Sequence, residues 1–373
     1  MRIKKLHIRN FKSLVDFELE DLKPFCAFVG PNASGKSNIF EALEFTYYVL
    51  SSTKFTNSNR IDLRYFGGNT ILSFNAREVT SFGGVAYGNM RKTDIGFYLE
   101  FDNAVLLKFY IPISETDNLN PRIFPVAVKP DSNFRLGSGS TEFNDVKHRQ
   151  GLVGEVNESS VEYRKDYNAF VDNFGRVFIG KPALLRFPVS PGRLAVDGSN
   201  LSQIIGTVFE NKDRRTDFVE WLRILIPEFK DIDVKRSNID GSYNFFIYEK
   251  GTERPFPRNL ISDGTYNILS LMAAVYQSNQ PQFLCIEEPE NGLHPQAIEL
   301  LVDFFREKCE EEGHHIWLNT HSQTLVRCLE IDEIILVDKV DGATRAKQLR
   351  KEDEVNIKTD EAWLSNALGG GVL

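Results

Sequence analysis

The segment Gly30–Ser37 constrains the fold of this chain more than any other. Its sequence is Gly-Pro-Asn-Ala-Ser-Gly-Lys-Ser; an apolar run at 25–29 precedes it, and from Lys36 onward apolar residues recur at helical spacing. Glycines allow main-chain N–H groups to turn toward a phosphate, and the N-terminus of the following helix attracts the same anion. The order of strand, loop and helix therefore predicts a phosphate-binding loop in an α/β fold.

This motif assigns an expected role to each residue of the loop. Lys36 would bring a positive charge to the terminal phosphates of ATP, and the Ser37 hydroxyl would bind Mg²⁺. The remaining groups would surround the triphosphate. The predicted ATP-binding residues are Gly30, Asn32, Ala33, Ser34, Gly35, Lys36, Ser37 and Asn38.

Two carboxylates follow a second apolar run at 283–286. Glu287 is the predicted metal ligand, either directly or through water, and Glu288 is the predicted catalytic base that orients and deprotonates the attacking water. His321 follows another predicted buried strand, at 316–319. Because the carboxyl ends of parallel strands meet at one edge of a sheet, we expect His321 to lie beside Glu288 and to contact the γ-phosphate.

Strand patterns and helical patterns alternate at both ends of the chain, which predicts an α/β fold of the P-loop NTPase type, with a mixed or parallel sheet and flanking helices. We expect residues 1–50 and 255–373 to form this domain. Residues 51–254 would be a large insertion of mostly β or α+β character. Lys212–Leu225 is a predicted helix within the insertion, and the pair His314–His315 is expected in a solvated turn.

The composition narrows the class of protein. The chain has 373 residues, a formal net charge of −8 and no apolar run long enough for a membrane span, so we expect a cytoplasmic protein that does not bind membranes. The negative charge argues against a basic surface over the whole chain, but a local nucleic-acid patch stays open. Cys26 and Cys285 lie inside apolar runs and are expected to be buried.

Four motifs in a fixed order resemble those of a known family. They are Gly30–Ser37, Leu260–Thr265, Ile286–Pro295 and Thr320–Ser322. The set resembles the ABC-type ATPases of the RecF/SMC/OLD branch, and is most similar to the compact "AAA family" ATPases of OLD and Septu-like prokaryotic defence systems. The resemblance implies an ABC ATPase head that converts ATP and water to ADP and phosphate.

The resemblance also implies a homodimer that sandwiches ATP, or a higher oligomer. Ser262, Asp263 and Gly264 of one subunit would cap the γ-phosphate held by Lys36 of the other. From the residues alone, Ser262 or Asp263 could equally be the N-cap of the helix that follows. The motif departs from that of transporters at Asp263, and the glutamine that senses the γ-phosphate in this family is left open, with Gln150 and Gln203 as candidates.

The expected function is a nucleotide-gated switch in prokaryotic anti-phage defence that controls a separately encoded effector, a nuclease. About 35 residues follow the predicted strand at 334–337, too few for the TOPRIM nuclease domain that OLD nucleases carry. The alternative is a DNA repair or recombination ATPase of the RecF/SMC type that binds DNA directly. A third possibility is a scaffold that binds ATP without turnover, against which Glu288 argues.

Overall fold

The computed structural model divides into two compact units. It describes residues 3–51, 61–62, 95–101, 106–111, 122–123, 126–128, 170, 172–179, 192–239, 241–353, 358–365 and 367–368. The first unit comprises residues 1–22, 33–172 and 338–346, and the second comprises 23–32, 173–337 and 347–373. The phosphate loop crosses this division, because Gly30–Asn32 belong to the second unit and Ala33–Ser37 to the first.

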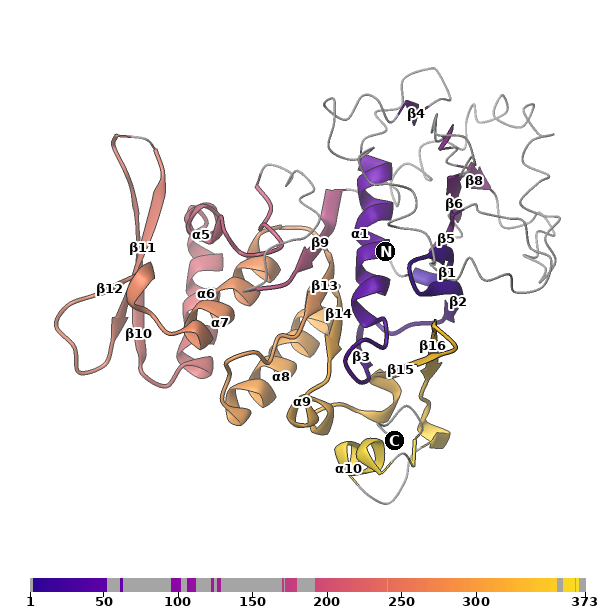
Figure 1. Cartoon of the computed structure of the whole chain (residues 1–373). Helices are drawn as coiled ribbons and strands as arrows, with labels where there is room; N and C mark the ends of the chain where they lie inside the picture. Colours follow the sequence, from indigo (N-terminus) through magenta and orange to yellow (C-terminus); the bar gives the residue numbers. More distant parts are fainter. Residues whose placement is uncertain are drawn as a thin grey trace. The chain divides into compact units, whose positions relative to one another are not determined.

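The first unit is built on an antiparallel sheet with the strand order β2-β1-β5-β6-β8. Exposed and buried residues alternate along β2, as expected for a strand with one face on the core. Helix α1 begins at Lys36, directly after the phosphate loop (Figure 1). The elements of this unit are β1 (Ile3–Phe11), β2 (Leu14–Glu20), α1 (Lys36–Ser51), β4 (Ile61–Asp62), β5 (Ile95–Phe101), β6 (Leu106–Ile111), β7 (Arg122–Ile123) and β8 (Val126–Val128), with β4 paired to β7.

The second unit holds β3, β9, β13, β14 and most of β15 from a sheet with the strand order β16-β15-β3-β14-β13-β9, whereas most residues of β16 belong to the first unit. The pairs β15–β3, β3–β14, β14–β13 and β13–β9 are all parallel. Every residue of β3, β14 and β13 is buried, which explains their continuous apolar runs. These strands are β3 (Phe25–Val29), β9 (Phe174–Val177), β13 (Phe283–Glu287), β14 (His315–Thr320), β15 (Ile334–Val340) and β16 (Ala343–Gln348).

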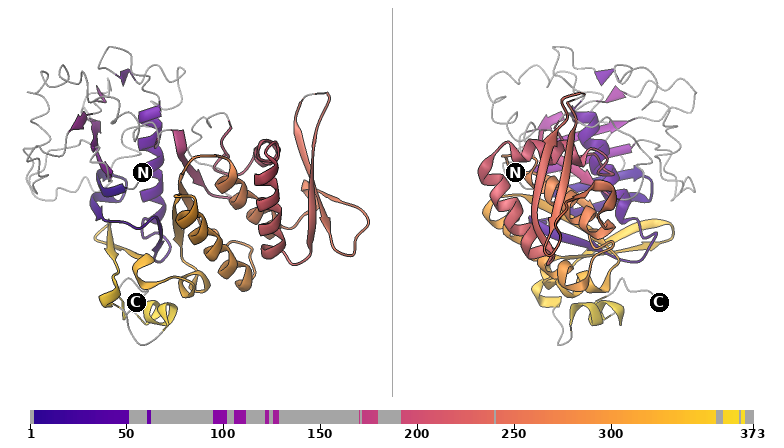
Figure 2. Two further views of the ribbon diagram at one scale, coloured as in Figure 1. Left: turned by 180° about the vertical axis from the view of Figure 1, so that it is seen from behind. Right: turned by 90° about the vertical axis from the view of Figure 1, so that its left-hand side faces the viewer.

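Helices pack against this sheet, and a second, smaller sheet lies beyond α5. In the order β10-β11-β12, an antiparallel sheet packs against α5, on the far side of α5 from α7 (Figure 2). The remaining elements are α5 (Leu201–Phe209), α6 (Lys212–Leu225), β10 (Phe229–Arg236), β11 (Tyr243–Glu249), β12 (Phe256–Pro257), η3 (Arg258–Leu260), α7 (Asp263–Tyr276), α8 (Pro295–Glu311), α9 (Gln323–Arg327), η4 (Ile331–Glu333), η5 (Lys351–Asp353) and α10 (Thr359–Leu364).

Comparison with the sequence predictions gives agreement for most elements. The α/β fold is confirmed, the helix predicted at Lys212–Leu225 is α6, and Cys26 and Cys285 are buried. β9, α5, α6, β10 and β11, which the sequence places in the insertion, all belong to the second unit, and the domain boundaries at 50/51 and 254/255 stay a prediction. Most of the predicted insertion before residue 170 lies outside the described residues. No described helix is both long enough and apolar enough to cross a bilayer.

The prediction of a solvated turn at His314–His315 is wrong. His314 is 1% exposed and His315 is 7% exposed. His315 is the first residue of β14 and pairs with Phe283 of β13, so it belongs to the sheet. The ring nitrogen Nδ1 of His314 accepts a hydrogen bond from the main-chain N–H of Gln282, 2.9 Å away. The imidazole therefore satisfies a buried donor that would otherwise be unpaired.

Candidate functional site

The backbone conformation of the phosphate loop requires a glycine at position 35. Gly35 has φ +103° and Ala33 has φ +65°, both in the left-handed region. A Cβ atom added to Gly35 would lie 1.9 Å from Oγ1 of Thr344 and 2.8 Å from Oγ of Ser13. Both the positive φ and the lack of space therefore exclude any side chain at position 35.

A series of hydrogen bonds between four groups supports the phosphate loop. Asn38 Nδ2 donates to Ser13 Oγ at 2.7 Å, Ser13 Oγ and Thr344 Oγ1 are 2.6 Å apart, and Thr344 Oγ1 donates to the carbonyl of Ser34 at 2.9 Å. Because each hydroxyl has one proton, these contacts run in a single direction from Asn38 to Ser34. Sequence reasoning missed Ser13 and Thr344, which are separated by 331 positions.

The groups in the first unit fit a bound triphosphate. The hydroxyl of Ser34 is buried and makes no hydrogen bond within the described part of the chain. An unpaired buried hydroxyl is costly, and a phosphate oxygen would satisfy it. Lys36 is 7% exposed and lies at the first position of α1, where the helix dipole also favours an anion. Ser37 follows it and could bind Mg²⁺, as its place in the motif predicts.

In the second unit, three parallel strands end at the same edge of the sheet. Val29 of β3 is in register with Thr320 of β14, and Asn319 of β14 is in register with Glu287 of β13. The main-chain N–H of Gly30, where the phosphate loop begins, points to the carbonyl of Thr320 at 3.4 Å. The start of the loop, the residues before His321 and the acidic strand end are therefore neighbours.

Glu287 is held on both of its carboxylate oxygens. Arg176 of β9 pairs with Oε1 through two guanidinium nitrogens, with Nε at 2.7 Å, and Asn319 Nδ2 donates to Oε2 at 3.0 Å. The side chain of Glu287 has no exposed surface, and that of Arg176 is 8% exposed. A buried carboxylate of this kind is stable only because it is paired and hydrogen-bonded. The sequence analysis did not identify Arg176 or Asn319 as partners of Glu287. Asn319 could have been identified, because it is a polar residue in a predicted buried strand.

Glu288 lies next to His321, as the sequence predicts. His321 Nδ1 is 3.5 Å from Glu288 Oε1. The other oxygen, Oε2, accepts a hydrogen bond from Asn291 Nδ2 at 3.0 Å. Glu288 has φ +46°, and its N–H donates to both the carbonyl and the side-chain oxygen of Asn319. The chain thus turns sharply at Glu288, which directs its carboxylate away from the strand and toward the imidazole.

The motif at Ser262–Gly264 forms the start of α7. Ser262 is the N-cap, since its Oγ accepts the N–H of Thr265 at 3.1 Å, and Ser262 and Asp263 are both exposed. Gly264 packs against the carbonyl of Gly292, which an added Cβ would approach to 2.5 Å. One turn later, Asn267 Nδ2 donates to the carbonyls of Pro289 and Asn291 at 2.9 and 2.8 Å. The start of α7 is therefore fixed to the loop that follows Glu288.

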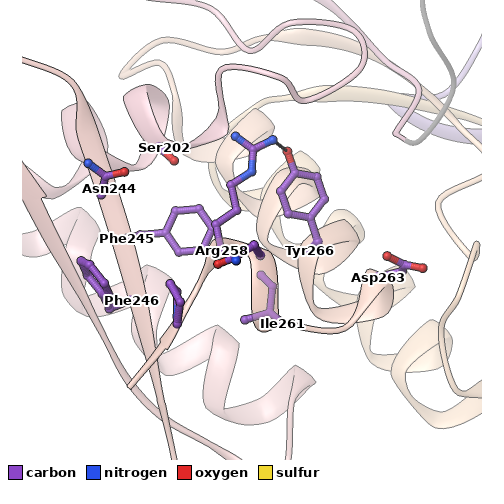
Figure 3. A pocket seen from close by; sticks show the side chains of 10 residues that line it. Ser202, Asn244, Phe245, Phe246, Arg258, Ile261, Asp263 and Tyr266 are labelled. Atoms are coloured by element: carbon purple, nitrogen blue, oxygen red, sulfur yellow. Dashed lines mark hydrogen bonds between the residues drawn. The ribbon is translucent and has the colours of Figure 1, made fainter. Parts of the chain in front are cut away.

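A pocket of about 420 Å³ opens beside the same helix end (Figure 3). Arg258 donates to the Tyr266 hydroxyl at 2.7 Å, and this hydroxyl donates to the carbonyl of Gly198 at 2.8 Å. Figure 3 shows the guanidinium of Arg258 next to the ring of Tyr266, with Asp263 on the other side of Tyr266. Of the two candidate glutamines, Gln203 is exposed on α5, and Gln150 lies outside the described residues.

A protein-family model described as "AAA domain, putative AbiEii toxin, Type IV TA system" matches residues 25–327. The chain belongs to this family. The matched residues run from β3 to α9 and so include the phosphate loop, the acidic strand end and His321. The resemblance to ABC-type ATPases is thereby confirmed, and the chain is a nucleotide-binding P-loop ATPase.

Individual relatives agree with membership in the AAA-domain family. A Helicobacter pylori protein named "ATP/GTP phosphatase" is 21% identical over 95% of this chain and 94% of its own length. The "Chromosome partition protein Smc" of Methanocaldococcus jannaschii is 28% identical over 44% of this chain, which spans 14% of that protein. A crystal structure of an SMC head bound to the C-winged helix domain of ScpA has a TM-score of 0.58 at 15% identity, over 94% of this chain and 98% of that one. This last similarity shows the shared fold.

Proposed function

We propose that the chain hydrolyses ATP with Glu288 as the catalytic base and His321 as a contact to the γ-phosphate. The observation that carries this proposal is the parallel register of β3, β14 and β13, which brings Gly30, Thr320 and Glu287 to one edge of the sheet. Glu288 would orient the attacking water and accept its proton, while Lys36 and the loop amides bind the phosphates.

Mg²⁺, held by Ser37 and the phosphate oxygens, would neutralise charge that develops on the terminal phosphates. Because Arg176 and Asn319 already donate to both oxygens of Glu287, we propose that this carboxylate contacts the metal through water. Direct contact, the other alternative that the sequence leaves open, would have to use Oε2, since Oε1 already accepts two hydrogen bonds from Arg176.

Replacement of Glu288 by Gln tests the assignment of the base. The amide has nearly the same shape but cannot accept the proton, so we expect turnover to fall by roughly 10²–10⁴-fold while ATP still binds. Both ATP and GTP should be assayed, since a relative is named for both. Unchanged turnover would show that another group acts as the base. Binding without turnover in the wild-type chain would favour the scaffold instead.

We propose further that ATP joins two copies of the chain, with Ser262, Asp263 and Gly264 of one copy facing the γ-phosphate bound to the other. The exposed N-terminus of α7, a helix of 14 residues, supports this role because the helix dipole attracts anions there. The Glu288→Gln variant should form this dimer, or a higher oligomer, when ATP is added. Size-exclusion chromatography with light scattering, with and without ATP, would measure it.

The function we propose is a nucleotide-gated switch in anti-phage defence, in the cytoplasm, that controls a separately encoded nuclease. Two observations support it: the family description names a toxin and a Type IV TA system, and Asn267 couples α7 to the loop after Glu288, so that the nucleotide state can reach a dimer surface. Co-expression with the products of flanking genes tests the proposal. A chain that neither self-associates with ATP nor co-purifies with any of those products would contradict it.

A DNA repair or recombination ATPase is the second candidate. The partial identity with a chromosome partition protein favours it. In that case the chain itself should bind DNA, with an affinity that falls steeply as salt increases because counterions are released. Filter binding between low and physiological salt measures this dependence. No affinity at low salt would exclude direct DNA binding.

A further inference from the structure

Glu290 is a buried carboxyl group two residues beyond Glu288, and neither role proposed above uses it. It is 8% exposed. Its Oε1 atom accepts a hydrogen bond of 2.5 Å from the hydroxyl of Thr320, the last residue of β14. The main-chain amide of His321 lies near this carboxyl group and lowers its pKa. Glu290 therefore holds the chain by a hydrogen bond at Thr320, the residue directly before His321.

Further hydrogen bonds hold the residue after His321. The N–H of Ser322 donates to Oγ1 of Thr320 at 2.9 Å, and the Ser322 hydroxyl caps α9 by accepting the N–H of Leu325. The hydroxyl of Thr320 thus links the N–H of Ser322 to the carboxylate of Glu290, on either side of His321 in the chain. The His321 imidazole is 41% exposed, so packing alone does not fix it, and the turn at 320–322 determines where it points.

Burial of the Glu290 carboxylate costs free energy that a purely structural role would not require. Oε2 of Glu290 is buried and makes no hydrogen bond to any described residue. One acceptor is enough to tie the turn, and an amide would provide it without burying a charge. Hydrogen bonds to a carboxylate are about twice as strong as those to a neutral acceptor, which favours a turn that must be held rigidly.

We infer that Glu290 is a positioning residue for His321, which holds the turn 320–322 so that the imidazole stays beside Glu288. The inference rests on the proposed function, because it assumes that His321 contacts the reacting phosphate. Glu288 has its own supports in Asn291 and Asn319. Loss of Glu290 should therefore displace His321 and leave Glu288 in place.

ATP hydrolysis by the full chain tests the inference. Glu290→Leu removes the acceptor at similar volume and should lower kcat by about 10²-fold, since misplacement of a catalytic contact by about 1 Å has this effect. Glu290→Gln keeps a weaker acceptor and should lose about tenfold. Thr320→Val should resemble Glu290→Leu, while Thr320→Ser, which keeps the hydroxyl, should retain most of the activity. KM for ATP should change far less than kcat.

A double-variant cycle separates positioning from general damage. If Glu290 acts through His321, then Glu290→Leu should cause no further loss of kcat in the His321→Ala background. Equal losses in both backgrounds would overturn the inference. Should Glu290→Leu fail to fold, as judged by thermal melting, the same cycle is run with Glu290→Gln and Thr320→Val.

The outcomes also distinguish the inference from the proposed function. Wild-type turnover in His321→Ala would mean that His321 is misassigned, and the proposed function would then need revision. A slow His321→Ala variant alongside fully active Glu290 and Thr320 variants would reject the positioning role alone. Glu299→Gln, which changes an exposed carboxyl on α8, is the matched control and should behave as wild type.

Discussion

The guanidinium of Arg176 and the carboxylate of Glu287 form a buried ion pair across neighbouring strands β9 and β13. The two residues are 111 positions apart in the chain. Glu287 carries the predicted metal-binding carboxylate, so this pair fixes the orientation of that carboxylate. Removal of either partner leaves the other charged group buried without compensation.

Arg176→Ala should therefore destabilise the protein by about 3–5 kcal/mol, as expected for a broken buried ion pair. Arg176→Lys keeps the positive charge but loses the bidentate geometry of the guanidinium. Its free energy of unfolding should therefore lie between those of the wild type and Arg176→Ala. Urea denaturation measures the free energy of unfolding, with the exposed Arg254→Ala as control. Adding Glu287→Gln to Arg176→Ala should restore part of the stability, because no buried charge is then left unpaired. A loss no larger than that of Arg254→Ala would contradict the account.

The phosphate loop should depend on Thr344 in the same way that the acidic strand end depends on Arg176. Thr344→Val keeps the shape of the side chain but removes the donor to the Ser34 carbonyl and the contact with Ser13. Loss of about 1–2 kcal/mol of support should weaken ATP binding by about tenfold. A titration with a fluorescent ATP analogue measures the Kd, and Thr344→Ser should stay near wild type. Equal affinities for the two variants would show that the hydroxyl plays no part.

The sequence predicted the parts of this site that are local or that lie in fully buried strands. The phosphate motif specifies its own loop, and the apolar runs at 25–29, 283–286 and 316–318 identify parallel strands whose ends must meet. Glu288 and His321 follow from those runs. The fold is predictable for the same reason, since these segments form the centre of the sheet.

The supporting residues could not be predicted, because their partners lie far away in the chain. Arg176 lies in β9, a strand of four residues with no clear periodicity, inside a segment expected to be an insertion. Thr344 is 310 positions from Ser34. His314–His315 follow Gly313, a pattern typical of a surface turn, yet strand pairing with β13 places them in the interior. In each case a tertiary contact overrides the local signal.

Asn267 should couple hydrolysis at the two sites of the proposed dimer. In such a dimer each chain offers its α7 to one site and its Glu288 to the other, and Asn267 joins these two parts within one chain. Asn267→Ala leaves one buried carbonyl, that of Pro289, and one partly buried carbonyl, that of Asn291, without their donor, at about 1–3 kcal/mol. We expect a lower kcat and a Hill coefficient for ATP closer to 1. The dependence of rate on ATP concentration measures both, with the exposed Asn259→Ala as control. Unchanged cooperativity would indicate that the sites communicate by another route.

The buried position of Glu290 gives the stability of the protein a specific pH dependence. Burial, together with the negative charge of Glu288, raises the pKa of Glu290 to about 7, although the hydrogen bond from Thr320 and the nearby main-chain amides of Glu290 and His321 lower it. The folded state therefore binds this proton more tightly than the unfolded chain, in which the carboxyl has its ordinary pKa of 4.5. Between these two values the folded state holds more protons than the unfolded state, so the free energy of unfolding falls as pH rises.

Glu290→Gln removes this contribution, because the amide does not titrate. The stability of the variant relative to wild type should therefore be more favourable at pH 8 than at pH 5, by on the order of 3 kcal/mol at most. Urea midpoints at the two pH values measure the difference, and Glu299→Gln should show none, since that carboxyl is exposed. A difference of opposite sign would mean that the carboxylate of Glu290 is stabilised in its charged form by contacts stronger than its burial. In that case Glu290→Gln would be both less stable and slower than wild type at pH 8. A buried, destabilising carboxylate predicts instead that the variant is more stable than wild type at pH 8 but has a lower kcat.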